Sequence, residues 1–194
     1  MILGLDISTS IIGATVLNKD GSIFSWQAWE LNRKHMNSQI DKADFVRFQL
    51  KNLHKSTKEQ IEHVFIEKPL QRFAPGFSSA KTLSTLSSFN GMISWICYEC
   101  FEQYPEYLSA QSARKLCGIK VPRGQKAKEI VLNFLIDNEP SFVVEYTRYG
   151  NPKQKFYDIA DSIIIARAGL KYLEQEKNVQ SRQNTDSTKD IWVV

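Results

Sequence analysis

The sequence predicts an α/β fold with a sheet of mixed strand direction. Three apolar runs typical of strands open the chain, at residues 2–5, 11–17 and 23–29. The link between the last two, Asn18-Lys19-Asp20-Gly21, is a strong hairpin signal, so we expect the chain to open as an antiparallel meander. Residues 43–53 have helical spacing and lead into a fourth strand at 64–67, which a helical crossover would add in parallel.

The second half of the chain is predicted to be mostly helical. Residues 80–101 form a long, apolar helix, and a short strand at 107–109 precedes helices at 111–116, 125–136 and 158–174. From Gln175 the composition turns to Gln, Asn, Ser, Thr, Lys and Asp, which is typical of disorder. We therefore expect one domain over residues 1–175 and a disordered polar tail over 176–194.

Composition and charge limit the classes of protein to which this chain could belong. The chain has 194 residues and a net charge of +4, so any basic surface must come from local patches. No apolar run is long enough for a membrane span, and no signal-peptide pattern opens the sequence, so we expect a soluble, cytoplasmic protein. Cys97 and Cys100 have zinc-like spacing but lie inside an apolar helix, which favours packed, reduced thiols.

Four acidic residues stand at the ends of apolar segments. Asp6 ends the first strand, Glu67 ends the fourth, and Asp158 and Asp161 open the last helix, just before Ile163. Carboxylates that are removed from water need a counter-charge, and acids at positions i and i+3 share one face of a helix. If the four converge, a hard divalent cation such as Mg²⁺ is the simplest partner.

Each acid also has a simpler interpretation when it is taken alone. Asp6 could cap N–H groups at a strand-to-turn junction, and Glu67 could be a solvated strand end. Asp158 could be a helix N-cap with Asp161 as its partner in the first turn. The combination of two strand ends and one helix start, in this order, favours a metal site.

Basic residues gather on either side of these acids. The stretch 111–128 contains six cations and no acid, Arg148 lies just before the acidic pair, and Lys68 and Lys81 follow Glu67. Such runs are often only a solvated face, but acids flanked by cations suit an enzyme that cuts a polyanion, with a small phosphorylated molecule as the alternative ligand. The candidate DNA contacts are Arg72, Phe73, Arg114, Lys115, Arg123, Lys126, Lys128, Lys153 and Lys155.

The loop after Glu67 holds two aromatic residues beside the predicted acids. Phe73 and Phe77 could stack on bases or wedge between them, or they could pack beneath their own loop. Cleavage of a phosphodiester needs a deprotonated water and a stabilised leaving oxygen, which two metal ions can provide together. Four carboxylates suffice to hold two such ions.

Four segments together resemble a known family over residues 1–173. They are GLDISTS with Asp6, VFIEKP with Glu67, YLSAQSARKLCGIKVPRGQKAKEIV, and YDIADSIIIA with Asp158 and Asp161. The chain resembles the RuvC-type Holliday-junction resolvases of the ribonuclease H-like superfamily. The resemblance implies a ribonuclease H-like mixed five-stranded sheet flanked by helices, a homodimer, and cutting of four-way or branched DNA by paired nicks with Mg²⁺ or Mn²⁺.

The resemblance also assigns roles to single residues. It implies that the four acids bind two metal ions and that Lys126 contacts DNA near the scissile phosphate, with a further basic position at Arg114 or Lys115. The chain departs from bacterial members at Ile7-Ser8, where they carry Pro-Gly, and at Pro69-Leu70, where they place an aromatic wedge. These departures are closer to the phage and viral resolvases.

Other functions compete with this interpretation. GLDISTSIIGATVLNKDG also resembles the phosphate hairpin of actin- and sugar-kinase-like ATPases, but 194 residues with nine glycines leave no room for their second domain and second glycine-rich hairpin. A binding protein without activity gives no reason for four acids beside phosphates. A ribonuclease H-like enzyme acting on RNA–DNA hybrids or other branched DNA is the main alternative. We expect residues 80–101 to form the dimer interface.

Overall fold

A computed structural model describes residues 1–32, 34–57, 60–69 and 80–187, with side chains of the last helix as far as Ser181. Five strands in these residues form one sheet with the order β3-β2-β1-β4-β5. The strands are β1 (Ile2–Ile7), β2 (Ile11–Leu17), β3 (Ile23–Glu30), β4 (His63–Glu67) and β5 (Glu106–Leu108). The meander β1-β2-β3 is antiparallel, whereas β4 runs parallel to β1 and β5 parallel to β4. The predicted mixed sheet is confirmed.

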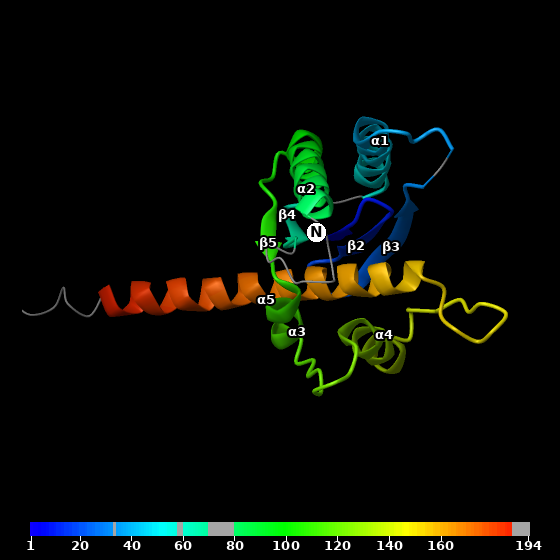
Figure 1. Ribbon diagram of the computed structural model, residues 1–194. Coiled ribbons are helices and arrows are strands. Elements are labelled where there is room, and N and C mark those ends of the chain that lie inside the picture. Colours follow the sequence, from blue (N-terminus) through cyan, green and yellow to red (C-terminus); the bar gives the residue numbers. More distant parts are fainter. Residues whose placement is uncertain (33, 58–59, 70–79, 188–194) are drawn as a thin grey trace, which may run out of the picture.

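Five helices of the described chain flank the sheet, and Figure 1 shows that they form a layer on each face. They are α1 (Gln39–Ser56), α2 (Ala80–Phe101), α3 (Ala110–Leu116), α4 (Ala127–Asn138) and α5 (Lys155–Ser187). The helices α1 and α2 cover one face, and α5, backed by α3 and α4, covers the other. The first helix begins earlier than predicted because Ser38 and Asp41 form a reciprocal capping box.

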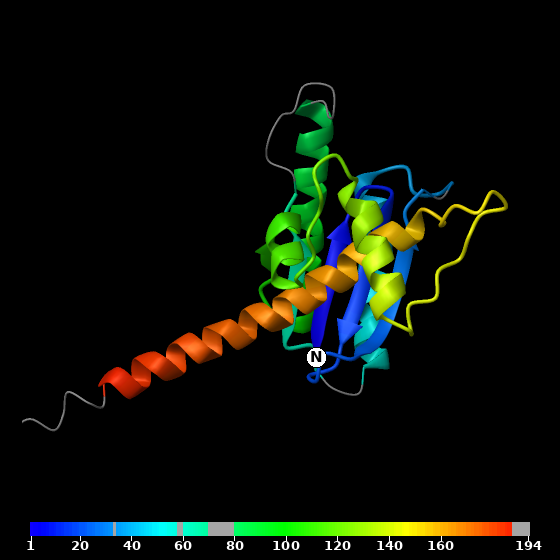
Figure 2. The same ribbon diagram turned by 90° about the horizontal axis from the view of Figure 1, so that it is seen from below.

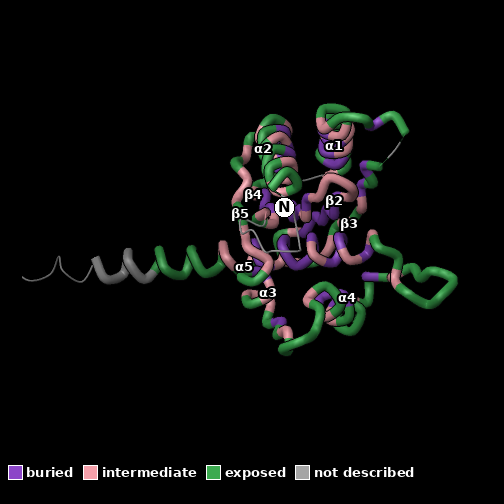
Figure 3. The backbone as a smooth tube through the Cα atoms, in the orientation of Figure 1, coloured by how far each residue is buried: buried purple, intermediate pink, exposed green. Residues whose placement is uncertain are grey.

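The alternation of side chains along β1 divides the core in two. Leu3, Leu5 and Ile7 pack toward α1 and α2, while Ile2 belongs to the cluster that contains α5. In Figure 3 the buried residues follow the central strands and the part of α5 that crosses them. Since successive side chains point to opposite faces, Asp6 lies on the α5 side of the sheet.

The last helix is longer than predicted. We expected a helix over 158–174 and a disordered tail from 176, but α5 continues to Ser187 and extends away from the sheet in Figure 2. The stretch after Gly169 lacks glycine and proline and contains Leu, Glu, Gln and Lys, which favour helix without tertiary contacts. Within the described residues, no helix combines the length and apolar character needed to cross a membrane.

Candidate functional site

The first two acids of the site lie side by side at the carboxyl ends of parallel strands. The register of β1 and β4 pairs Leu5 with Ile66, so Asp6 and Glu67 are the next residues along their strands. Residues at matched positions of neighbouring strands point to the same face of a sheet. Both carboxylates therefore face α5 at one edge of the molecule.

Two glycines let α5 lie directly on the sheet. Gly13 is the cross-strand partner of Asp6, and a Cβ atom built on it would lie 2.0 Å from the carbonyl oxygen of Asp158. A Cβ atom on Gly4 would lie 2.6 Å from the backbone of α5 at Ser162. The buried hydroxyls of Thr15 and Ser162, 2.7 Å apart, hold the helix in this register. The close approach brings the first turns of α5 over Asp6.

The acids consequently converge on one point. Carboxylate oxygens of Asp6, Glu67 and Asp161 all lie within 4.8 Å of one another, and no other described His, Cys, Asp or Glu side chains form such a group of three. Asp158 joins them through the ammonium of Lys128, on the first turn of α4. We call Asp6, Glu67, Asp158 and Asp161 the acidic cluster.

Lys128 provides a positive charge within the acidic cluster. Its Nζ lies 3.2 Å from Asp158 Oδ1, 3.3 Å from Asp161 Oδ2 and 4.0 Å from Asp6 Oδ2. These three carboxylate side chains are only 10%, 12% and 14% exposed, whereas that of Lys128 is 53% exposed. One ammonium at the mouth of the site therefore faces three carboxylates.

The pKa directions show that this one cation does not balance the acids. Burial, followed by repulsion from Glu67 and Asp161, raises the pKa of Asp6 well above its ordinary value. Burial and the charge of Asp161 raise the pKa of Glu67 to about 7, and burial raises the pKa of Asp161 against the opposing charge of Lys128. Burial disfavours the charged form of Lys128, but the acids outweigh it and raise its pKa. The cluster can accept further positive charge.

The comparisons with known proteins identify the fold. No family model matches this chain, and neither does any curated protein. The structure of Thermus thermophilus RuvC in complex with a Holliday-junction substrate matches with a TM-score of 0.60 and 11% identity over 90% of this chain and 94% of that one. The yeast mitochondrial Holliday junction resolvase Ydc2 matches with a TM-score of 0.60 and 19% identity over 95% of this chain and 83% of that one. This chain has the fold of RuvC-type resolvases.

A further T. thermophilus RuvC structure, at 14% identity, matches with a TM-score of 0.56 over 90% of this chain. The resemblance and the fold class predicted from the sequence are thus confirmed. At these identities the likeness establishes the RuvC-type fold, while the roles of individual residues must be argued from the contacts in this chain.

Those contacts distinguish two lysines on the RuvC-type scaffold. The sequence resemblance pointed to Lys126, but that residue precedes α4, has a side chain 80% exposed, and pairs with Glu129 at 2.8 Å. Lys128, two residues later, is the lysine that reaches the acids. Arg114, on α3, is also close enough for its charge to oppose the raised pKa of Glu67 and Asp161.

The remaining predicted DNA contacts fall into three groups. Arg114 and Lys115 line a hollow of about 440 Å³ beside α3, and Arg123 is exposed in the turn before α4. Lys153 and Lys155 bind Glu145, at 2.7 Å and 2.8 Å, and not the acidic cluster. The residues Arg72, Phe73 and Phe77 lie outside the described part of the chain.

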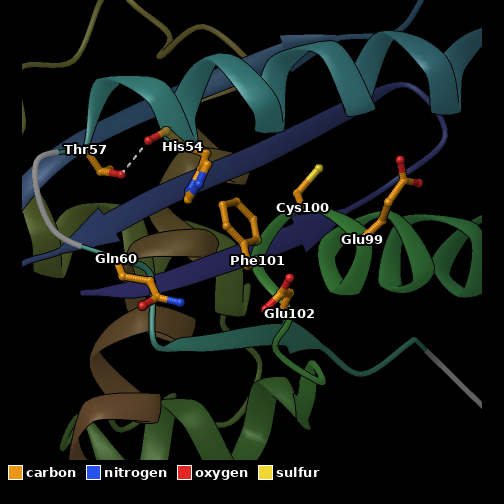
Figure 4. Close-up of a pocket in the computed structure, with 7 residues that line it drawn as sticks. All are labelled: His54, Thr57, Gln60, Glu99, Cys100, Phe101 and Glu102. Carbon is orange, nitrogen blue, oxygen red and sulfur yellow. Dashed lines mark hydrogen bonds between the residues drawn. The ribbon is translucent and has the colours of Figure 1, made fainter.

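A separate hollow of about 470 Å³ lies between the C-terminal ends of α1 and α2 (Figure 4). It is lined by His54, Thr57, Gln60 and residues 99–102, and the ring of His54 packs edge-on against that of Phe101. The amino terminus of Met1 donates to the Gln60 carbonyl, so this hollow lies at the opposite end of β1 from Asp6, about 16 Å away along the strand. It is separate from the acidic cluster.

Sequence reasoning missed the residues that bring the acids together. The sequence pattern places Gly4 and Gly13 only within strands, and it does not distinguish Lys128 from the other basic residues around it. A usable signal did exist, because a glycine in an apolar strand marks the close approach of another backbone. No comparable pattern in the sequence indicates which residues Lys128 contacts, because these contacts depend on how α4 packs beside α5.

Proposed function

We propose that this protein is a metal-dependent, structure-selective DNA endonuclease that resolves four-way junctions by paired nicks. The observation that carries the proposal is the convergence of Asp6, Glu67 and Asp161 to within 4.8 Å, with Asp158 linked to them by Lys128. This convergence occurs on a fold shared with proteins described as Holliday junction resolvases. Cations around the acids fit a polyanionic substrate better than a neutral one.

The acidic cluster suits hard divalent cations. It offers carboxylate oxygens alone, which Mg²⁺ and Mn²⁺ prefer, and burial together with repulsion between the acids raises the pKa values of Asp6 and Glu67. Asp6, Glu67, Asp158 and Asp161 would hold two such ions. When bound, these ions would supply an activated water and stabilise the leaving oxygen of the cut strand. Protons held by Asp6 and Glu67 would be released on loading.

The basic residues then have distinct tasks. The half-exposed ammonium of Lys128 lies at the mouth of the cluster, within reach of a phosphate oxygen that approaches the carboxylates. Arg114 supplies a second positive charge on the α3 side. The exposed Arg123 and Lys126 attract the backbone at longer range and set the salt dependence of binding.

We further propose a homodimer through the face formed by α1 and α2. Trp95 on α2 is 64% exposed, and together with the exposed Ile40 of α1 it borders a groove of about 510 Å³ between the two helices. A junction cut at two symmetric positions has a two-fold axis, which a two-fold protein matches. In sedimentation, Trp95→Glu should convert a dimer to a monomer. A wild-type monomer at micromolar concentration, both free and on junction DNA, would overturn the dimer.

A cleavage assay tests the proposed activity. Purified protein and Mg²⁺ are mixed with an end-labelled four-way junction, a linear duplex of the same sequence, and an RNA–DNA hybrid. Symmetric nicks in the junction alone, absent with Asp6→Asn, are the expected result. Cutting of the hybrid alone would assign the protein to the ribonuclease H class, and no cutting of any substrate would refute the nuclease.

A further inference from the structure

The segment between α4 and α5 forms a closed loop that projects from the body. We call residues 145–153 the Tyr149 loop, and both Figure 1 and Figure 2 show this region, in yellow, extending beyond the start of α5. The amide of Lys153 donates to the Glu145 carbonyl at 2.9 Å, and the amide of Thr147 to the Asn151 carbonyl at 2.8 Å. An isolated bridge joins Tyr146 to Pro152. The loop is therefore a small hairpin.

Ion pairs fix the base of the Tyr149 loop to the helix that carries two of the acids. The ammonium groups of Lys153 and Lys155 bind the two carboxylate oxygens of Glu145, at 2.7 Å and 2.8 Å. Lys155 is the first residue of α5, three positions before Asp158. These lysines, which the sequence suggested as DNA contacts, are thus engaged in holding the loop. The position of the tip is tied to the acidic cluster through a single helix.

The tip of the loop presents aromatic rings to solvent. Tyr149 is 72% exposed, and Tyr146 is also exposed. The guanidinium of Arg148 lies 4.6 Å from the centre of the Tyr149 ring and donates a hydrogen bond to its hydroxyl. A cation and a ring held together on a closed turn need little ordering before they bind, so less entropy is lost on binding.

We propose that the Tyr149 loop is a DNA contact in which Tyr149 stacks on an unpaired base near the branch and Arg148 binds the adjacent phosphate. This proposal rests on the proposed junction nuclease. Aromatic rings beside cations are the usual platform for unstacked bases, because every base has a π-face. The charge of the loop supports DNA as the partner. The only acid of the loop, Glu145, is already neutralised by two lysines, so the tip keeps the positive charge of Arg148.

Binding of labelled DNA tests the loop separately from cleavage. The affinities for a four-way junction and a linear duplex are measured in the Asp6→Asn background with EDTA, so that no strand is cut. Tyr149→Ala should weaken junction binding about tenfold, and more than duplex binding, because one stacked base is lost. Tyr149→Phe keeps the ring and should stay within about twofold of the parent. Arg148→Gln should lower the salt slope of binding by about one phosphate contact.

Tyr104 provides a matched control. It is 79% exposed just after α2 and stacks on Tyr98, with ring centres 4.7 Å apart, so Tyr104→Ala removes an exposed tyrosine on another element. Junction affinity should not change in this variant. A 2-aminopurine placed at the branch should be quenched by the parent protein and much less by Tyr149→Ala.

Two results would overturn the stacking contact. One is a Tyr149→Ala protein that binds and quenches the junction like Tyr104→Ala, and the other is a Tyr149→Phe protein as weak as Tyr149→Ala. Either result, together with normal junction cutting by the wild type, would refute the loop proposal alone. A wild-type protein that neither cuts nor binds junctions would refute the proposed function itself.

Discussion

The acidic cluster and the base of the Tyr149 loop use the same chemical groups in opposite proportions. In the acidic cluster, three carboxylates surround the ammonium of Lys128, and burial with repulsion raises the pKa of the neighbouring Glu67 to about 7. At the base of the loop, one carboxylate meets two lysines, and hydrogen bonds from Lys153 and Lys155 lower the pKa of Glu145 to about 2. Two glutamates in one chain are thus shifted in opposite directions.

This difference separates an acidic group that could bind a metal ion from a carboxylate that is already paired with cations. The single carboxylate of Glu145 already faces two lysine ammonium groups, so a further cation would stabilise it little. The ionised forms of Asp6 and Glu67 are unfavourable in the acidic cluster, and an added cation would stabilise these ionised forms. The raised pKa values of Asp6, Glu67 and Asp161 support the proposal that a metal binds at the acidic cluster.

Removing one acid from the cluster should have the largest effect. Asp6→Asn should slow junction cleavage by at least about a thousandfold, roughly 4 kcal/mol of transition-state stabilisation, since the proposed ligand set is broken. Junction binding should stay equal or become slightly tighter, because a charge that repels phosphate is gone. Single-turnover cleavage with Mg²⁺ and binding in EDTA measure the two effects.

Glu62→Gln, which breaks the 2.8 Å ion pair between Glu62 and Lys19, is the matched control for that experiment. It also converts a lysine-bound carboxylate to an amide, but it should leave the cleavage rate within about threefold of the wild type. Near-normal cutting by Asp6→Asn in Mg²⁺ would show that the proposed metal site is wrong.

The next largest effect should come from the cation inside the cluster. Lys128→Gln removes the ammonium that competes for the carboxylates, so the affinity for Mn²⁺ should rise by about tenfold. Lys126→Gln removes the same charge two residues away, where it pairs with Glu129, and should change metal affinity little. Calorimetric titration of Mn²⁺ compares the two variants. Equal affinities in both would mean that Lys128 does not compete with metal.

The sequence was sufficient to predict the strand order at the start of the chain and the convergence of Asp6, Glu67 and Asp161. The patterns used for this prediction are local: the apolar runs, the hairpin signal at Asn18–Gly21 and the acid at the end of each run. Local patterns can be recognised without knowledge of the tertiary packing. The parallel addition of β4 followed from the helical crossover before it. These features place Asp6 beside Glu67, and the structure confirms that they are neighbours.

The rest depended on contacts between distant segments. Lys126 and Lys128 are indistinguishable in the sequence, and only the packing of α4 beside α5 separates the lysine that reaches the acids from the one in solvent. The pairing of Lys153 and Lys155 with Glu145, eight and ten residues earlier in the chain, could not be predicted from the sequence. The end of α5 was missed because a polar composition describes a solvated helix as well as a disordered tail.

The pH dependence of stability should reveal the raised pKa of Glu67. The folded protein holds this proton up to about pH 7, whereas the unfolded chain releases it near its ordinary pKa of 4.5. Between these values the folded state binds more protons, so the metal-free protein should lose stability as the pH rises from 4.5 to 7, by roughly 5 °C in Tm. Thermal unfolding in EDTA measures this loss, and Glu67→Gln should flatten the curve. A wild-type curve as flat as that of the variant would contradict the raised pKa.

Glu145 should show the opposite and smaller dependence. Its folded pKa of about 2 lies below its ordinary 4.5, so its stabilising contribution is complete above 4.5 and is lost as the pH falls toward 2. Its side chain is 50% exposed, so solvent screening keeps the effect to about one or two degrees in Tm. The difference in Tm between the wild type and Glu145→Gln should therefore be present at pH 6 and fall to less than half of that value at pH 3. A difference as large at pH 3 as at pH 6 would mean that Glu145 stabilises the loop by packing and not by its charge.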